Sequence, residues 1–430
     1  MPPEAGLAIF ALLLALYGSV GLLLGRWSIT MPMVCVVIGA ALGAYGLGAL
    51  SISPEAEAVK RLTEATLAIL LFADASTLNF NVLRHDAALP ARLLGIGLPL
   101  TIALGALVAF ALFPSQGWSF ALLVAAILAP TDAALGLPIF TNPKVPVRIR
   151  RALNVESGLN DGIATPFVSL FLALAIAEAD ASQRGWLVNA IEELAIAVGV
   201  GIAVGFVGGR FLTFAQGRGW TQGVPLQMAA LALAFGAYLG SIAVGGNGFV
   251  AAFVGGMAFG VGSRGQLAAA TEYSESTGNL LSLLVWSIFG AVFVVPIALQ
   301  GADPRAILYA LLSLTVVRML PVWVAMAGKR LRPDTRLLMG WFGPRGLASV
   351  VFGLLAFDTL GPLRPETQAL VSAVTWTILL SVIAHGLSAQ PLAAWYARRL
   401  AATGGDLPEL EDVPEPPTRK RALLGVTPHH

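Results

Sequence analysis

The densest group of residues capable of chemistry lies in the sequence ESGLND, residues 156–161. Residues four apart are neighbours on a helix, so Glu156 pairs with Asn160 on one face and Ser157 pairs with Asp161 on the next. The Asn160 amide can then donate to the Glu156 carboxylate, which leaves Ser157 and Asp161 to offer oxygens to a ligand. Hard cations prefer oxygen ligands and a carboxylate also takes a proton, so one site of this kind can carry either.

Two apolar segments contain residues that interrupt a helix. The first contains APTD, in which Pro130 removes a backbone donor just before Asp132. The second contains FGPRG, in which Pro344 precedes Arg345. A helix end leaves carbonyl and amide groups without helical partners, so each interruption can bind an ion.

The composition indicates the medium in which these residues work. Of the 430 residues, 57% are hydrophobic and 12% are charged, against about 45–50% and about 25% in soluble proteins. A water-soluble globule is therefore excluded, and the aromatic content of 8% disfavours a membrane β-barrel. The single cysteine, Cys35, excludes an intrachain disulfide, and the net charge of +2 gives no support for nucleic-acid binding. We predict an all-α polytopic membrane protein.

A helix needs about 20 mainly apolar residues to cross a bilayer. We expect about thirteen transmembrane helices, at about 5–25, 31–50, 63–80, 93–113, 118–140, 153–177, 187–209, 226–243, 248–262, 279–299, 306–326, 337–357 and 367–394. They form one transmembrane domain, residues 1–400. The proline-rich, charged residues 401–430 are predicted to be a disordered cytoplasmic tail.

The positions of lysine and arginine agree with thirteen spans. With the N-terminus outside, sixteen basic residues fall in cytoplasmic loops and the membrane-proximal tail, and five fall in external loops. The positive-inside rule therefore favours an external N-terminus and a cytoplasmic C-terminus. The expected location is the cell (inner) membrane.

The two interruptions indicate an inverted repeat. Thirteen helices divide into six, a connecting helix and six, which gives two halves at about 5–177 and 226–394. The interruptions in spans 5 and 12 then each lie in the fifth helix of their half. Because seven spans separate them, the halves insert with opposite topology. Matching broken helices point to a transport site near the bilayer midplane. The alternative is that proline and glycine are simply common in membrane helices.

The order APTD, ESGLND and FGPRG, with LLFADASTLNFNVLR at 70–84, resembles the Na+/H+ exchanger family of monovalent cation:proton antiporters, in its NhaP-type branch with an Asn-Asp pair. The resemblance covers about residues 5–395. It implies a core and a dimerisation domain, a homodimer, no cofactor and a part in pH homeostasis. It also implies one-for-one, electroneutral exchange by alternating access, with Na+ as the expected cation and Li+ or K+ left open.

The resemblance assigns roles to residues of the ESGLND helix and the first interruption. Asp161 is similar to the carboxylate that alternately binds cation or proton, and Ser157 and the Thr131 backbone are similar to further cation ligands. Ala133 departs from the family, in which many members have proline after the aspartate. The shape of the first interruption therefore stays open.

Other roles are structural. Glu156 resembles a carboxylate held by Asn160 and by Arg345 of the second interruption. The residues that support the two broken helices are Pro130, Asp132 and Pro344.

Three further ionisable residues fall within predicted spans, where charge is costly. Asp74 either lines an access funnel or is a hydrogen-bonded structural carboxylate. Arg318 either pairs with a core carboxylate or extends towards an interface. Histidine ordinarily titrates near neutrality, which would suit His385 to a pH sensor, but we favour a buried histidine with satisfied hydrogen bonds.

Other functions compete with antiport. An intramembrane protease is the enzyme alternative, but no histidine forms a plausible dyad with Ser157 and no GxSG frames it, so we expect no enzyme. A sodium-coupled organic-anion symporter is the more serious rival, although its site needs neutral polar ligands more than a buried aspartate. A channel is a third reading.

Overall fold

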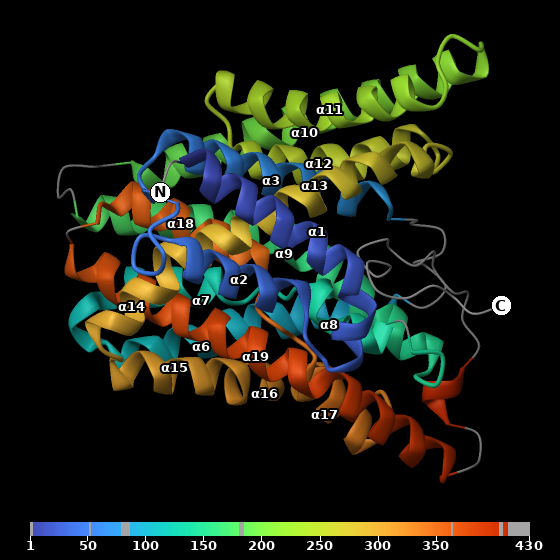
Figure 1. Ribbon diagram of the computed structural model, residues 1–430. Coiled ribbons are helices and arrows are strands. Elements are labelled where there is room, and N and C mark those ends of the chain that lie inside the picture. Colours follow the sequence, from blue (N-terminus) through green and yellow to red (C-terminus); the bar gives the residue numbers. More distant parts are fainter. Residues whose placement is uncertain are drawn as a thin grey trace. The chain divides into compact units, whose positions relative to one another are not determined.

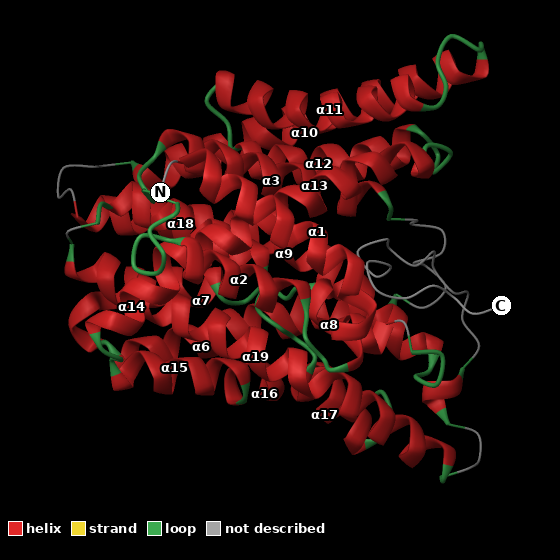
Figure 2. Ribbon diagram, in the orientation of Figure 1, coloured by secondary structure: helices red, strands yellow, loops and turns green. Residues whose placement is uncertain are grey.

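The computed structural model describes residues 3–50, 53–78, 87–140, 142–179, 185–362, 364–403 and 407–411. Within these ranges every regular element is a helix and there is no strand (Figures 1 and 2). Helices occur in each of the thirteen predicted segments. Seven of the described helices are long and apolar enough to cross a membrane, and four shorter apolar helices accompany them. The all-α membrane class is confirmed, while the count of thirteen spans stays a prediction.

The chain divides into two compact units that differ from the predicted repeat halves. Unit 1 comprises Met1–Arg61, Ala88–Ser157 and Leu283–His430. Unit 2 comprises Leu62–Ala87 and Gly158–Ser282. The helix α9 (Val147–Ala179) begins in unit 1 and continues without interruption into unit 2, with Pro166 inside it.

Unit 1 contains most of the interrupted helices. Two of them include single π-helical turns, η1 and η3, which insert an extra residue into the helical ladder. The elements are α1 (Pro3–Arg26), α2 (Met31–Leu42), α5 (Ala88–Arg92), η1 (Leu93–Gly97), α6 (Leu98–Leu112), η2 (Pro114–Gln116), α7 (Gly117–Ile127), α8 (Ala133–Phe140), the start of α9, the end of α13 (Ala268–Phe289), η3 (Gly290–Val294), α14 (Val295–Gln300), α15 (Pro304–Leu314), α16 (Val316–Ala325), α17 (Pro333–Trp341), α18 (Leu347–Leu360), α19 (Pro365–Ala401) and η4 (Pro408–Leu410).

A hydrophobic core in unit 1 joins the helices that carry the polar residues singled out above. Leu153 of α9, Leu338 of α17 and Tyr396 of α19 are among its buried members. Further members come from α8 and α16, and Leu407 packs against the cluster from beyond the end of α19. The core therefore fixes α9, α17 and α19 relative to one another at one end of this unit.

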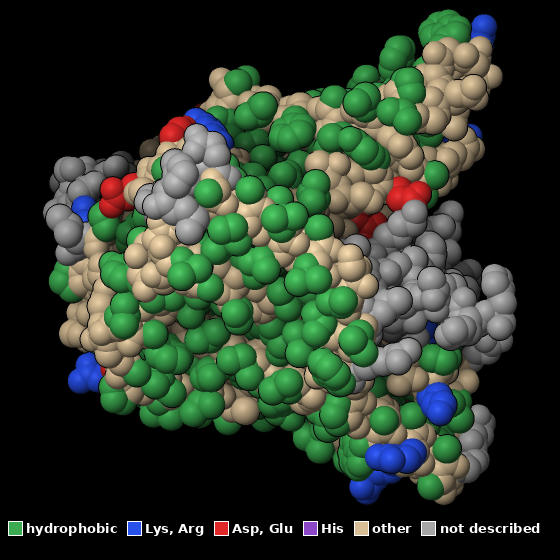
Figure 3. Space-filling model, in the orientation of Figure 1, with side chains coloured by type: hydrophobic (Ala, Val, Ile, Leu, Met, Phe, Trp, Pro, Cys, Tyr) green, Lys and Arg blue, Asp and Glu red, His purple; other side chains and the backbone are tan. Residues whose placement is uncertain are grey.

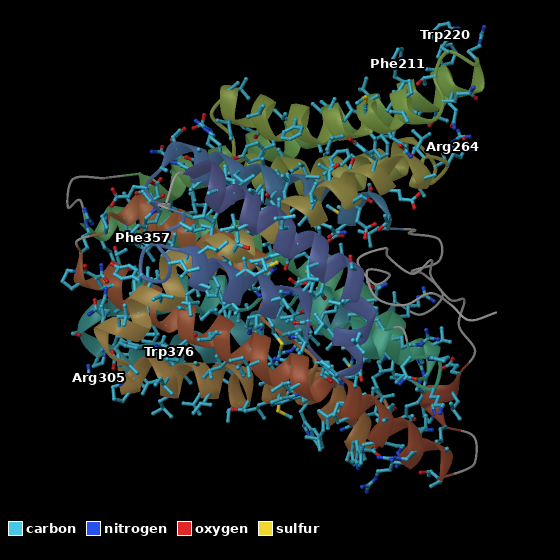
Figure 4. All side chains as sticks on the ribbon, viewed as in Figure 1. Phe211, Trp220, Arg264, Arg305, Phe357 and Trp376 are labelled. Carbon is cyan, nitrogen blue, oxygen red and sulfur yellow. The ribbon has the colours of Figure 1, made fainter. Side chains whose placement is uncertain are left out.

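Unit 2 contains most of α3 (Glu57–Ser76), the rest of α9, α10 (Trp186–Gly217), α11 (Val224–Ala243), α12 (Gly248–Gly262) and most of α13. The helices α10 and α12 cross closely because small residues face each other: a Cβ on Gly205 would lie 2.0 Å from the Gly255 carbonyl oxygen. Phe211, near the C-terminal end of α10, and Trp220, in the loop that follows it, point outward and are 58% and 67% exposed (Figure 4). Such exposed apolar side chains suit a lipid environment.

The predicted disordered tail is in part ordered, so that prediction was wrong for residues 401–403 and 407–411. The helix α19 continues to Ala401, and Glu409 is fully buried. Its Oε1 atom accepts hydrogen bonds from the Arg332 backbone at 2.7 Å and from the Thr335 hydroxyl at 2.9 Å. Composition indicated disorder, but these tertiary partners hold one oxygen of the buried carboxylate in place. Residues 404–406 and 412–430 lie outside the described residues.

Candidate functional site

The first predicted interruption is confirmed within unit 1. The helix α7 ends at Ile127, residues 128–132 are not helical, and α8 begins at Ala133. Proline at position 130 removes a donor, so the helical ladder stops there. Thr131 and Asp132 are 1% and 8% exposed. The interruption therefore places a hydroxyl and a carboxylate inside the protein.

The second interruption is also confirmed, and it meets the first. Residues 342–346 separate α17 from α18. The Asp132 backbone N–H donates to the Pro344 carbonyl at 2.8 Å, and Asp132 Oδ2 accepts from the Leu347 N–H at 3.2 Å. A carboxylate at the first residue of α18 satisfies an unpaired donor and complements the positive end of the helix dipole. The close approach requires glycine, since a Cβ on Gly346 would lie 2.0 Å from the Asp132 Cβ.

Arg345, from the second interruption, binds the carbonyl groups at the C-terminal end of α7. Its side chain is fully buried, and Nη1 donates to the carbonyls of Ala129 at 2.8 Å and Pro130 at 3.4 Å. Its Nη2 donates to the Ser313 carbonyl at 3.2 Å. The guanidinium thus lies just beyond the C-terminal end of α7, where the dipole favours a cation. Each interruption supplies the charged residue that compensates a helix end of the other.

The ion-pair partner of Glu156 is Arg318, which corrects the expectation that Arg345 holds this carboxylate. Arg318 Nη1 lies 2.6 Å from Glu156 Oε1, and Nη2 donates to Oε2 at 2.9 Å. Both side chains are at most 2% exposed. Arg345 is instead committed to carbonyl oxygens, which leaves Arg318 to match the carboxylate with a two-pronged fork. The alternative that Arg318 pairs with a core carboxylate is confirmed.

A third interruption positions Arg318, and sequence reasoning missed it. The helix α15 ends at Leu314, and Thr315 adopts φ −111° and ψ −92° before α16 begins. The Thr315 hydroxyl donates to the Leu311 carbonyl at 2.6 Å, a bond to the preceding turn that bends helices. Neither proline nor glycine marks this position, so only the threonine signalled it. The position of the Arg318 side chain also requires glycine at residue 343, because a Cβ there would lie 2.2 Å from Arg318 Nε.

Two hydroxyl groups come together beside the first interruption. Thr131 Oγ1 lies 3.3 Å from Ser157 Oγ, and both residues are at most 4% exposed. Ser157 follows Glu156 on α9, so the Glu156–Arg318 pair fixes the helix turn that presents this hydroxyl. Hydroxyl oxygens and the carbonyls of an unwound segment are ligands for a hard monovalent cation. The structure therefore brings Thr131 and Ser157 together within unit 1. The predicted ligands are the Thr131 backbone and Ser157, and their role in binding a cation stays a prediction.

The remaining candidates on α9 and α3 belong to unit 2. Asn160 is 1% exposed, whereas Asp161 is partly exposed and its backbone carbonyl accepts from the Thr165 hydroxyl at 2.8 Å. Asp161 follows Ser157 by one turn, about 6 Å along the axis of the continuous helix. Asp74 is 5% exposed in α3. The assigned roles of these three residues stay predictions.

The comparison with protein families decides which class of protein builds such a site. The family described as "Sodium/hydrogen exchanger, transmembrane" matches residues 9–395. The chain belongs to this family. The exchanger family is a family of transporters, in agreement with the resemblance read from APTD, ESGLND and FGPRG.

Relatives of this exchanger include antiporters of two cation types. It is 28% identical over 319 residues to a "Na(+)/H(+) antiporter" of Schizosaccharomyces pombe, covering 67% of each chain. It is 25% identical over 370 residues to the "K(+)/H(+) antiporter NhaP" of Alkalimonas amylolytica, covering 84% of this chain and 62% of that protein. Among solved structures, the sodium proton antiporter MjNhaP1 from Methanocaldococcus jannaschii matches with a TM-score of 0.71 at 20% identity, over 92% of this chain and all of the other. The exchanger therefore has the same fold as MjNhaP1.

Several polar residues of the exchanger site were not found from the sequence. The Ser349 hydroxyl donates to the Ile127 carbonyl at 2.6 Å, which satisfies one more acceptor at the end of α7. The backbone carbonyl of Ser313 and the hydroxyl of Ser381 both accept from Arg345. Isolated serines in apolar helices are the only local signal for such contacts. His385 is buried with both ring nitrogens in hydrogen-bonding contact, so the prediction of a satisfied histidine is confirmed.

Proposed function

We propose that this exchanger is a secondary active antiporter that exchanges a monovalent cation for protons across the membrane by alternating access. The observation that carries the proposal is the pair of crossed helix interruptions whose Thr131 hydroxyl meets Ser157 on α9, in a chain of the sodium/hydrogen exchanger family. Relatives named for Na+ and for K+ support a monovalent cation. Na+ is the first cation to test, followed by K+ and Li+.

The charges of the site favour one-for-one exchange. Glu156 is paired with Arg318, and Asp132 and Arg345 are committed to helix ends, so we assign none of these groups to the exchange of proton and cation. Asp161 then carries either one proton or one monovalent cation, with Ser157 and Thr131 as further ligands. The loaded site has the same net charge in both forms. Exchange is therefore electroneutral, and protons compete with the cation for a single carboxylate.

Contacts at the two ends of unit 1 support the proposed orientation. Lys60 in the first turn of α3 pairs with Asp358 near the end of α18 at 2.7 Å, and the predicted topology assigns both residues to the outside. Arg148 pairs with Glu411 at 2.6 Å, and both lie in segments assigned to the cytoplasm. Lysine and arginine also gather near α17 on the face in Figure 3, while hydrophobic side chains cover the broad surface between. We place the C-terminus in the cytoplasm, the N-terminus outside, and the protein in the cell (inner) membrane as a homodimer.

The test is cation-dependent proton flux in proteoliposomes that enclose a pH-sensitive dye. Addition of NaCl, KCl or LiCl should move protons without any organic substrate, whereas choline chloride at the same osmolarity should not. The variant Asp161→Asn should abolish the response while its elution profile in detergent stays that of the wild type. Retained flux in this variant would remove Asp161 from the mechanism. Flux that requires an organic anion would favour the symporter, and no flux with any of the three cations would refute antiport.

A further inference from the structure

One turn of α19 holds both flanks of the second helix interruption. Ser381 and His385 are four residues apart, and both are fully buried. Ser381 Oγ accepts from the backbone N–H of Arg345 at 2.7 Å. His385 Nε2 lies 2.9 Å from the carbonyl oxygen of Trp341, the last residue of α17. His385 therefore contacts Trp341, which ends α17, and Ser381 contacts Arg345, whose guanidinium binds the carbonyls of the first interruption.

The chemistry of the partners assigns the protons along this contact. A carbonyl oxygen only accepts, so His385 Nε2 carries a proton and donates it to Trp341. The neutral ring then accepts at Nδ1, 3.1 Å from Ser381 Oγ. Since Ser381 Oγ already accepts from Arg345, its own proton is available for Nδ1. The result is one directed chain of hydrogen bonds from the Arg345 N–H through Ser381 and His385 to the Trp341 carbonyl.

The surroundings keep the ring in this neutral form. Burial removes the His385 ring from water, and the buried guanidinium groups of Arg345 and Arg318 also act electrostatically on it. A positive charge on the ring would face both of them in a medium that screens poorly. A protonated Nδ1 would also donate rather than accept, and would turn to the Ser381 carbonyl, 3.0 Å away, in place of its hydroxyl. The directed chain therefore requires a neutral histidine.

Trp341 gives the same turn of α19 a second attachment. Its ring lies against that of His385, with centroids 4.9 Å apart. Its indole N–H donates to Ser388 Oγ at 2.9 Å. This bond fixes the tryptophan side chain but does not reach the backbone of residues 342–346. Ser388 thus offers a matched control for a serine on the same helix.

We propose that Ser381 and His385 are positioning residues, which set the geometry of the cation site through Arg345. The backbone of Arg345 is held by Ser381, and its side chain holds the carbonyls of Ala129 and Pro130. Thr131 follows directly, and its hydroxyl lies 3.3 Å from Ser157. Loss of the α19 contact moves Arg345, and with it the carbonyls that precede Thr131. The inference rests on the proposed antiport function.

The experiment compares Ser381→Ala, His385→Ala and His385→Gln with the control Ser388→Ala. Sodium-dependent proton flux is measured in proteoliposomes over a range of NaCl concentrations, and the apparent melting temperature is measured in detergent with and without NaCl. We expect Ser381→Ala and His385→Ala to raise the apparent KM for Na+ at least about five-fold, with a smaller change in maximal rate. His385→Gln, whose amide supplies both a donor and an acceptor, should restore most of the affinity. Ser388→Ala should leave KM unchanged.

The outcomes separate positioning from simple packing. A shared fall in melting temperature with unchanged KM in Ser381→Ala and His385→Ala would overturn the proposal, as would equal KM values in Ser381→Ala and Ser388→Ala. If His385→Ala does not fold, Ser381→Ala still decides, because it removes a single hydroxyl group. If the wild type shows no cation-dependent flux, the proposed function fails separately. The stabilisation by NaCl, and its loss in Ser381→Ala but not in Ser388→Ala, then tests the positioning role by itself.

Discussion

Neutralising one member of the Glu156–Arg318 pair should destabilise the protein more than the pair's modest net contribution would suggest. The guanidinium nitrogens lie 2.6 and 2.9 Å from the two carboxylate oxygens, in side chains at most 2% exposed. For charge centres about 4 Å apart at an effective dielectric constant of about 20, the attraction is about 4 kcal/mol. This agrees with a cost of about 3–5 kcal/mol for leaving one buried charge without its partner. The double variant should therefore lose less stability than the sum of the single variants, by about 3–4 kcal/mol.

The two single variants should also differ from each other. Arg345 interacts electrostatically with both members of the pair. Glu156→Gln leaves two buried guanidinium groups without this carboxylate, whereas Arg318→Gln leaves Glu156 with Arg345 close by. We therefore expect Glu156→Gln to be the least stable of the set, followed by Arg318→Gln.

The assay is thermal unfolding in detergent, followed as the loss of the monodisperse peak in fluorescence-detected chromatography. Arg305→Gln is the control, because Arg305 is an exposed cation at the start of α15 (Figure 4), where loss of charge has little effect on stability. Additive shifts in the double variant would show that Glu156 and Arg318 do not interact. A shift for Glu156→Gln no larger than that for Arg305→Gln would refute the buried pair.

Three further predictions follow from the same geometry. Gly346→Ala should lower the free energy of unfolding by about 1–3 kcal/mol and abolish exchange, because the added Cβ would lie 2.0 Å from the Asp132 Cβ. The control Gly199→Ala, whose Cβ would meet nothing within 4 Å, should not destabilise its helix. Equal melting temperatures for the two variants would contradict the close approach at Gly346. The hydrogen bond from Arg332 holds the pKa of Asp334 below its usual range. The contribution of Asp334 to stability is therefore present above the unfolded pKa of about 3.9 and is lost as the pH falls through the lower folded value. The difference in melting temperature between wild type and Asp334→Asn should be constant above about pH 5 and shrink in more acidic buffer. Electroneutral exchange should be insensitive to a membrane potential set with potassium and valinomycin. If one uncompensated charge moved per cycle, the free energy of transport would instead change by about 2.3 kcal/mol per 100 mV. A sodium gradient that depends strongly on voltage would refute one-for-one stoichiometry.

Local signals in the sequence predicted the interruptions well. Pro130 and Pro344 act on their own backbone, so the positions of both breaks followed from the residue types. The break at Thr315 was missed, because threonine bends a helix only when its hydroxyl turns back to the preceding carbonyl. The ordered segment 407–411 was missed for a related reason. Its composition is that of a tail, and the contacts of Glu409 that hold it are made with residues more than seventy positions away.

Pairing of charges was the least predictable feature of the site. The sequence offered two buried arginines for one carboxylate, Glu156, and the resemblance favoured Arg345. The structure gives Glu156 to Arg318, and turns Arg345 towards the carbonyls at the end of α7. Both arginines have the same charge and reach, so only their distances in the folded chain distinguish them.

The sequence by itself determined the membrane class, the helical segments, the two proline-marked breaks and the polar face of α9, because hydropathy and backbone restriction act over one or two turns. Only the tertiary structure decided which residues meet across those breaks. Arg318 and Glu156 are 162 residues apart, and Arg345 and Pro130 are 215 residues apart. Contacts over such separations depend on how the helices pack, and one turn of α19 carries the serine and histidine that fix where Arg345 lies.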